Sequence, residues 1–360
     1  MMTTAQAQNP DSSIKRILII KLRHHGDMLL TTPVVNALKA RYPDAEIDML
    51  IYQETRDMLA ANPSIHYLHC IDRTWKKLGV WSHMAHEIHL MKQVMSRHYD
   101  LTLNLSDQWR SAIATRLTGA SVRLGFNFPK RQGAFWRFCH TQLVSTRNHH
   151  ALHTVEQNLS LLEPLQLPSI KPEATMSYAQ EDSEKVQHLL QQNQVSGRYI
   201  VVQPTSRWFF KCWSEEKMAA MLTQLRAEGY PLIVTSGPDK HELAMVDRIL
   251  KLCPQINVIS LAGKLTLPQL AALIDGAALF IGVDSVPMHM AAALKTPLVA
   301  LFGPSKLVFW RPWEAIGEVI WAGDFGPLPD PDNIDTNTSE RYLNAIPVNV
   351  VTDAARRLLA

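Results

Sequence analysis

Short apolar runs of strand length alternate with amphipathic segments of helix length along most of the chain. In the first half, strands are expected at residues 16–21, 47–51, 100–105 and 122–125, the first of them rich in β-branched side chains. Helices are expected to begin at Asp27 and to cover 55–61, 80–97, 111–117 and 154–161. Strands that alternate with helices favour βαβ units, so the pattern predicts a parallel sheet.

The alternation is interrupted near residues 165–180, where Pro164, Pro168 and Pro172 indicate a domain boundary. It then restarts, with strands expected at 199–202, 232–235, 258–259, 277–281 and 297–302 and helices at 215–228, 239–252, 267–274, 290–294 and 348–359. Residues 125–153, which are basic and aromatic, and 323–339, which are rich in Pro, Asp and Asn, are expected to be irregular.

The pattern predicts an α/β protein with two Rossmann-like parallel-sheet domains of similar size that face each other across a ligand cleft. The expected division is a flexible N-terminus at 1–13, an N-terminal domain at 14–172, a C-terminal domain at 173–345, and a C-terminal helix at 346–360 that could pack back on the N-terminal domain. A length of 360 residues also exceeds the usual size of a single core.

Composition narrows the class of protein. A hydrophobic content of 46% with 19% charged residues argues against disorder, and a net charge of +3 is too small to indicate a nucleic-acid-binding protein. The four cysteines form no CxxC pair, which fits a reducing compartment and gives no zinc signal. Residues 1–13 carry no apolar signal core and the run at 17–20 is too short to span a membrane, so a cytoplasmic location is expected.

A carboxylate and an imidazole follow the expected strand at 277–281. A Gly turn at Gly282 leads into Asp284 and Ser285, and His289 lies five residues after Asp284, on the expected helix. Strand, tight turn and helix start form a phosphate- or sugar-binding corner in an open parallel sheet. Asp284 could accept hydrogen bonds from sugar hydroxyls, whereas a structural histidine is the simpler interpretation of His289.

Two further loops of the second half carry polar groups. Residues 203–213 include the hydroxyls of Thr205 and Ser206 and the cation Lys211 between a strand end and a helix start, which suits a pyrophosphate. Glu242 lies in the first turn of its helix, where the helix dipole favours an acid in any case. A carboxylate there could equally bind ribose hydroxyls.

The loop after the first strand, residues 21–27, is not a GxGxxG dinucleotide motif. Asp27 has two interpretations of about equal weight, a helix N-cap or a general base, and they compete because capping lowers the pKa of a carboxylate. The sequence also contains no Ser-His-Asp set, metal-ligand cluster or P-loop. Twin Rossmann-like domains with hydroxyl and lysine donors in the second domain suggest a nucleotide-sugar enzyme.

Three motifs together resemble the ADP-heptose:lipopolysaccharide heptosyltransferases, glycosyltransferase family 9. They are the Gly26-Asp27 loop, the loop that ends in Lys211-Cys212-Trp213, and the corner from Gly282 to His289. The likeness extends from Ile17 to about Leu359, and the chain is most similar to members that add a side-branch heptose. The resemblance implies a GT-B architecture, with the acceptor bound by 14–172 and the nucleotide-sugar donor by 173–345.

The resemblance also implies roles for single residues. Asp27 would be the catalytic base of an inverting transfer of L-glycero-D-manno-heptose from ADP-heptose to a heptose of the lipopolysaccharide inner core, and Lys211 would offset the charge on departing ADP. The other implied donor-site residues are Thr205 and Ser206 on the diphosphate, Glu242 on the ribose, Leu265 at the adenine, Asp284 on heptose hydroxyls, and Ser285 and His289 beside it. No metal or other cofactor is expected.

An anionic, lipid-linked acceptor would suit a set of cations in the first half, although a solvated rim is the alternative. The set is Arg73, Lys76, Lys77, Arg123, Lys130, Arg131 and Arg137. Such an acceptor implies peripheral association with the inner face of the inner membrane. The competing functions are another GT-B nucleotide-sugar transferase or an epimerase with a different donor, and a non-catalytic nucleotide-sugar-binding protein.

A run of three residues and one single residue depart from the pattern of the resembling family. Trp208-Phe209-Phe210 stands where smaller or acidic residues are common, and Pro287 stands where Gly is common. Proline donates no N–H, so a backbone contact from residue 287 to a ligand is lost.

Overall fold

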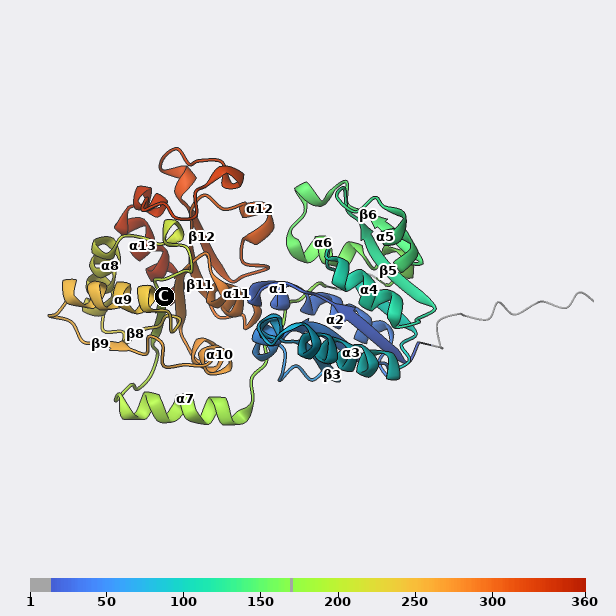
Figure 1. Ribbon diagram of the computed structural model, residues 1–360. Coiled ribbons are helices and arrows are strands. Elements are labelled where there is room, and N and C mark those ends of the chain that lie inside the picture. The colour runs from blue at the N-terminus through green and yellow to red at the C-terminus, as the bar shows by residue number, and fades with distance from the viewer. Residues whose placement is uncertain (1–13, 169–170) are drawn as a thin grey trace, which may run out of the picture. The chain divides into compact units, whose positions relative to one another are not determined.

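The computed structural model describes residues 14–168 and 171–360, which form two compact α/β units (Figure 1). The expected flexible segment 1–13 lies outside the described residues. The first unit comprises the described residues up to Arg56, Pro63–His150 and Glu156–Pro172, and the second comprises Asp57–Asn62, Ala151–Val155 and Glu173–Ala360. Each unit is built on one six-stranded sheet in which all paired strands are parallel.

The first sheet has the strand order β3-β2-β1-β4-β5-β6. Because the order reverses between β1 and β4, the carboxyl ends of these two strands form a switch point, where open α/β sheets bind ligands. In register, Leu18 of β1 lies between Asp48 of β2 and Thr102 of β4. The elements are β1 Arg16–Ile20, α1 His25–Leu29, α2 Thr32–Arg41, β2 Glu46–Tyr52, η2 Gln53–Met58, β3 Tyr67–Ile71, η3 Arg73–Lys77, α3 Val80–Ser96, β4 Leu101–Asn104, α4 Trp109–Leu117, β5 Val122–Asn127, α5 Ala134–Cys139, β6 Gln142–Ser145, η4 His149–Ala151, α6 Thr154–Ser160 and η5 Glu163–Leu165.

The second sheet repeats this topology with the order β12-β11-β10-β7-β8-β9, so its switch point lies between β7 and β10. Gly282 of β10 pairs with Gln203 of β7, and a Cβ at Gly282 would come within 2.6 Å of the Phe280 ring. The elements are α7 Gln180–Gln192, β7 Ile200–Gln203, η6 Phe209–Lys211, α8 Glu215–Ala227, β8 Leu232–Val234, α9 Lys240–Leu252, β9 Val258–Ser260, α10 Leu267–Asp275, β10 Leu279–Val283, α11 Val286–Ala293, β11 Leu298–Phe302, α12 Leu307–Trp310, β12 Gly317–Trp321, η7 Ala322–Asp324, η8 Pro331–Asn333, η9 Tyr342–Ala345 and α13 Val348–Leu359.

The helix expected near the C-terminus, α13, packs within the second unit. Val351, Ala354, Ala355 and Leu359 are buried in the core that β7, β8, β10 and β11 also line. The helix contacts β10, β11 and β12 of the sheet and α8 beside them. Its apolar stripe is continuous with that core, and burying the stripe there removes it from water.

Several elements were absent from the sequence prediction. Residues 125–153 are not irregular, because they contain α5 and β6, and the strands β3 and β12 and the helix α7 were also not predicted. β3 has the sequence YLHCI, in which His69 interrupts the apolar run. α5 spans only six residues and mixes three aromatic side chains with Arg137, so neither element shows a clear period. The helix expected at 55–61 is a short 3-10 segment, η2.

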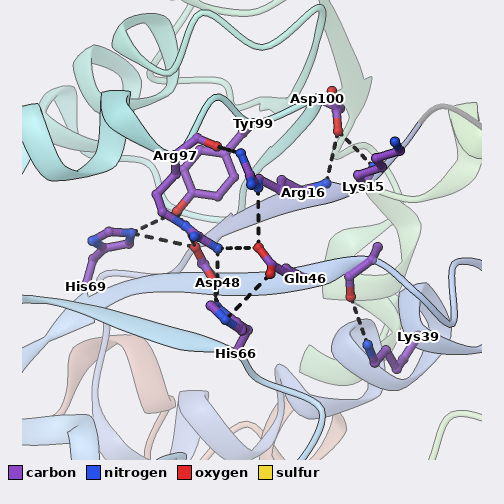
Figure 2. Close-up of polar contacts among 11 residues, drawn as sticks. Lys15, Arg16, Lys39, Glu46, Asp48, His66, His69, Arg97, Tyr99 and Asp100 are labelled. Carbon is purple, nitrogen blue, oxygen red and sulfur yellow. Dashed lines mark hydrogen bonds and ion pairs between the residues drawn. The ribbon is translucent and has the colours of Figure 1, made fainter.

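A buried polar network ties the amino end of the first sheet together (Figure 2). Asp48 is fully buried and accepts hydrogen bonds from Arg97 Nε at 2.8 Å and from the Tyr99 hydroxyl at 2.6 Å. Since Tyr99 donates to Asp48, the His69 Nε2–H donates to the Tyr99 oxygen at 2.8 Å, and His69 Nδ1 is buried with no partner among the described residues. Burial lowers the pKa of His69 to about 4, so the ring is neutral in the fold.

Candidate active site

The carboxyl end of β10 carries a carboxylate that is held by a cation. Lys211 Nζ lies 2.6 Å from Asp284 Oδ2, and both side chains are largely buried. Ser305, which follows β11, donates its hydroxyl to the same oxygen at 2.6 Å, and Ser206 donates to the Asp284 carbonyl at 3.3 Å. The structure therefore brings together Ser206 and Lys211 of the 203–213 loop with Asp284 of the corner from Gly282 to His289. It adds Ser305, which was not predicted.

A second carboxylate, Glu242, is held at the carboxyl ends of β7 and β8. The Thr205 hydroxyl donates to Glu242 Oε2 at 2.6 Å and the Gly237 N–H donates to the same atom at 3.2 Å. Thr205 is fully buried, and its oxygen in turn accepts from Gln203 Nε2 at 3.0 Å. Thr235 completes the relay by donating to Gln203 Oε1 at 2.7 Å. The buried relay fixes the position of the Glu242 carboxylate.

Sequence reasoning missed Gln203 and Thr235 in this relay. The available signal was a polar residue at the end of an apolar strand, since Gln203 closes the run IVVQ and Thr235 follows LIV. Such residues end their strands at the edge where ligands bind. The role of Thr205 on a diphosphate stays a prediction, because its hydroxyl donates to Glu242 in this structure.

The loop between Thr205 and Lys211 is shaped by a buried thiol and by stacked rings. The Ser206 N–H donates to Cys212 Sγ at 3.2 Å, and burial raises the pKa of Cys212 to about 12. Cys212 therefore stays a neutral thiol and acts in packing, not as a nucleophile. Trp208 stacks on Phe210 at 6.2 Å and places its ring 5.1 Å from Lys211 Nζ, which accounts for the large aromatic residues in this loop.

The remaining predicted donor residues occupy the helix start and a neighbouring loop. Ser285 is the N-cap residue of α11 and donates its hydroxyl to the Val283 carbonyl at 3.1 Å. Pro287 lies in the first turn of that helix, where a missing N–H breaks no helical hydrogen bond. His289 is buried on α11, and Leu265 is partly buried in the loop before α10.

In the first unit, Asp27 lies in α1 at the switch point of the sheet. The helix begins at His25, so Asp27 is its third residue and not its N-cap; its Oδ2 accepts from the His24 N–H at 3.3 Å. Lys21 Nζ lies 3.9 Å from Asp27 Oδ1 and donates to Asn158 Oδ1 at 2.9 Å. Burial lowers the pKa of Lys21, although the charge of Asp27 opposes that shift. The partners Lys21 and Asn158 were not predicted.

Asp107, after β4 at the same switch point, contacts two cations of the basic set, Lys130 and Arg131, and also Arg23. Lys130 forms an ion pair with its carboxylate, Arg23 lies 3.1 Å from Oδ1, and Arg131 donates to the Asp107 carbonyl at 2.6 Å. The three cations and Asp107 form one cluster at the carboxyl ends of β1 and β4. Lys130 pulls the pKa of Asp107 below its usual value, although burial opposes the shift.

The other members of the basic set are dispersed. Arg123 donates to the carbonyls of Cys139 and Ala120, so it has a structural role, and Arg137 donates to the Gln132 carbonyl. Arg73 lies 3.2 Å from Glu54 and 5.1 Å from the Tyr52 ring. Lys76 and Lys77 are exposed on η3.

Each unit thus presents charged groups where its strands end. In the second unit a lysine and hydroxyls surround Asp284, and a second carboxylate is fixed nearby on the relay from Thr235. In the first unit a carboxylate lies beside a buried ammonium. Across the described residues, the His, Cys, Asp and Glu side chains include no group of three arranged to hold a metal ion. The arrangement suits a ligand with both phosphates and hydroxyls in the second unit and proton transfer in the first.

Comparison with known proteins decides the family. Residues 88–339 match the sequence model of glycosyltransferase family 9 (heptosyltransferase). The chain belongs to this family. It is 45% identical over 338 residues to lipopolysaccharide heptosyltransferase 3 of Escherichia coli, an alignment that covers 94% of this chain and 97% of that relative. The resemblance seen in the three motifs is confirmed.

Solved structures of the family share the fold. A glycosyltransferase family 9 protein from Veillonella parvula matches 97% of this chain and 98% of its own with a TM-score of 0.82 at 22% identity. Heptosyltransferase WaaC of E. coli, solved with ADP, matches 95% of this chain and 99% of its own with a TM-score of 0.73 at 19% identity. The α/β fold with two parallel sheets, as in the GT-B heptosyltransferase structures, is confirmed. Membership favours a transferase over an epimerase or a non-catalytic binding protein.

Proposed function

We propose that this glycosyltransferase moves L-glycero-D-manno-heptose from ADP-heptose to a heptose of the lipopolysaccharide inner core, as a side branch. The observation that carries the proposal is the Lys211–Asp284 pair at the switch point of the second sheet, which offers one charge of each sign to a sugar diphosphate. The name of the relative that is 45% identical, lipopolysaccharide heptosyltransferase 3, supports the acceptor class and the heptose donor.

In this proposal the second unit holds the donor. Lys211 binds the diphosphate together with the hydroxyls at Thr205 and Ser206, and Asp284 accepts hydrogen bonds from the heptose hydroxyls, with Ser285 and His289 beside it. Glu242 binds the ribose, and Leu265 lines the adenine pocket. When phosphate oxygens reach Lys211, they compete with Asp284 for the same ammonium, so donor binding loosens the 2.6 Å ion pair.

The first unit supplies the base. Asp27 accepts the proton of the acceptor hydroxyl as its oxygen attacks the anomeric carbon, the bond from that carbon to the diphosphate breaks, and ADP leaves with the electron pair. The new bond forms on the opposite face, so the configuration inverts. The positive charge of Lys21 keeps the Asp27 side chain in place. Asn158 in turn positions the Lys21 ammonium by accepting a hydrogen bond from it. Lys211 offsets the charge that builds on ADP, and no metal ion or other cofactor takes part.

The acceptor is anionic and lipid-linked in this proposal. Lys76, Lys77 and Arg73 on η3, together with Lys130 and Arg131 at Asp107, are the cations that would meet it, whereas Arg123 and Arg137 are bound to backbone carbonyls. The enzyme would then work at the cytoplasmic face of the inner membrane by peripheral association. No helix among residues 14–168 and 171–360 has the length and apolar character needed to span a bilayer.

One assay tests the proposed function. The purified chain is incubated with ADP-heptose and core oligosaccharide from a strain that lacks this protein, and the oligosaccharide mass is measured. An increase by one heptose, and none with UDP-sugars as donor, is the expected result. Transfer from a UDP-sugar, or no transfer to this core, would overturn the proposal.

A further inference from the structure

Three helices of the first unit form one layer over the sheet. α3 packs beside α4, and α4 packs beside α5. Each precedes a strand on the β4-β5-β6 side of the switch point, and right-handed crossovers place such connections on the same face of the sheet. The outer surface of α3, α4 and α5 is called the α3–α5 face below.

The part of this face on α3 exposes an apolar stripe to solvent. Val80 is 76% exposed, Trp81 88%, Met84 53% and Ile88 47%. Val80, Met84 and Ile88 are four residues apart and therefore lie on one side of the helix, with Trp81 next to them. The helix contacts the unit through other residues, Leu90 and Val94, which are buried. The residues of the stripe therefore do not contribute to the core, and no other element of the described unit covers them.

The two neighbouring helices also expose apolar side chains. Ile113 of α4 is 44% exposed and Phe138 of α5 is 60% exposed. Elsewhere in the described chain, large exposed hydrophobic side chains are scattered, with no helix carrying more than one of them. An exposed apolar stripe such as the one on α3 marks an interaction site on a protein.

The charges around the stripe have one sign. α3, α4 and α5 contain a single acidic residue, Glu87, and it forms an ion pair with Arg110 of α4. Lys92 of α3 and Arg116 of α4 are exposed, and the Arg116 guanidinium lies 4.8 Å from the Phe138 ring centre. A cation held over an exposed ring places positive charge at the level of the apolar side chains.

We propose that the α3–α5 face docks on an anionic lipid surface, with Trp81, Met84 and Ile88 entering the boundary between headgroups and acyl chains. An interfacial site combines apolar side chains with flanking cations, because the former leave water and the latter meet lipid phosphates. This docking rests on the proposed function in one respect, since it would bring the first unit to a lipid-linked acceptor.

The charges favour a lipid over a second copy of this chain. Two copies joined through this face would bring Lys92 and Arg116 against the same cations of the partner, with Glu87 already neutralised by Arg110. An anionic bilayer neutralises these cations and accepts the apolar stripe in one contact.

Vesicle sedimentation tests the docking. The full chain is mixed with phosphatidylcholine vesicles made with and without phosphatidylglycerol, at low and high salt. We expect binding to the phosphatidylglycerol vesicles that weakens with salt, and a loss of roughly tenfold in partitioning for Trp81→Gln/Met84→Gln/Ile88→Gln. The matched control, Leu252→Gln/Val308→Gln/Ile316→Gln, changes three exposed apolar residues of the second unit and should bind as the unaltered chain does.

The outcomes separate the docking from the proposed function. Transfer to lipid-free core oligosaccharide should be equal in the unaltered chain and both triple variants. If the unaltered chain shows no transfer, the proposed function is refuted, and the vesicle experiment still tests the docking independently. Equal vesicle binding by the Trp81 triple variant and its control would overturn the docking. So would sedimentation that shows a dimer which the Trp81 triple variant converts to a monomer.

Discussion

Lys211 and Asp284, 73 residues apart in the sequence, are joined by an ion pair of 2.6 Å at the carboxyl edge of the second sheet. Only 15% of the Lys211 side chain and 7% of the Asp284 side chain are exposed. Taking such charges from water is unfavourable, and each is stabilised by the other. Removing one therefore leaves the other buried without its counter-charge, and a substitution at either position affects both.

Lys211→Met should lower kcat by roughly 10²–10³-fold, the range found when one group that stabilises developing negative charge is removed. The reason is that Lys211 is proposed to offset the charge on ADP as the bond to heptose breaks. Steady-state kinetics with ADP-heptose measure the effect, and Lys251→Met, at an exposed lysine, is the control. A variant with unchanged kcat and a raised KM would show that Lys211 only binds the donor.

Asp27→Asn should lower kcat by roughly 10²–10⁴-fold, because the amide cannot accept the acceptor's proton. Calorimetric titration with ADP should give the same Kd as the unaltered chain, since Asp27 is proposed to act on the acceptor. Asp44→Asn, at an exposed position, should match the unaltered chain in both measurements. Joint loss of transfer and ADP binding would contradict the base role.

Thr205→Val distinguishes two roles for one hydroxyl. If Thr205 acts by positioning Glu242, the Kd values for both ADP and adenosine should rise by roughly 10-fold or more, because a hydrogen bond to a partly buried carboxylate is lost. If Thr205 contacts the diphosphate, only the Kd for ADP should rise. Thr223→Val, which removes a hydroxyl bonded to a helix carbonyl, is the matched control.

Chelation of divalent metal should leave the transfer rate unchanged. Lys211 is proposed to supply the positive charge that a metal ion would otherwise supply at the diphosphate. The rate is measured before and after treatment with EDTA and gel filtration. A fall that added Mg²⁺ restores would overturn this part of the proposal.

The stability of the first unit should fall as the pH drops below the ordinary pKa of histidine. The pKa of His69 is about 4 in the fold against 6.5 when unfolded, so the unfolded chain binds the proton more readily. The stabilisation is complete above about pH 6.5 and is lost between about pH 6.5 and about pH 4. By about pH 5 the loss is about 2 kcal/mol.

Urea unfolding at about pH 7.5 and about pH 5 measures this loss. His69→Gln keeps a donor for the Tyr99 oxygen and should reduce the difference between the two pH values, while His89→Gln, at an exposed histidine, should preserve it. Equal pH dependence in the unaltered chain and both variants would show that the titrating group is elsewhere. Asp48 and Arg97 face His69, and their charges act on its pKa in opposite directions, Asp48 raising it and Arg97 lowering it.

The sequence predicted elements well where apolar residues run together, as in β1, β7, β10 and β11. It failed at β3, because His69 faces the Asp48 network and breaks the apolar run. It also failed at α5, which is held by packing around Trp136 and not by its own periodicity. In both cases contacts between distant residues determine the structure, and these leave no local pattern.

In the candidate site, too, single residues could be predicted from the sequence, whereas contacts between distant residues could not. Asp284, Lys211, Glu242 and Thr205 were recognised individually, because polar side chains that follow buried strands stand out in the sequence. Their pairing did not follow from the sequence, which carries no information on whether Thr205 meets Glu242 or a ligand. Lys21 and Asn158 are 137 residues apart, and only the fold places their side chains in contact.

The placement of α13 has a consequence for the order in which the two units fold during translation. All six strands of the first sheet have been synthesised once translation reaches Ser145, whereas the core of the second sheet lacks Val351, Ala354, Ala355 and Leu359 until α13 has been made. The nascent chain can therefore complete the first sheet before the core of the second unit has all of its side chains. A premature stop before Val348 would produce a chain with a formed first sheet and an uncovered second one, a target for proteolysis.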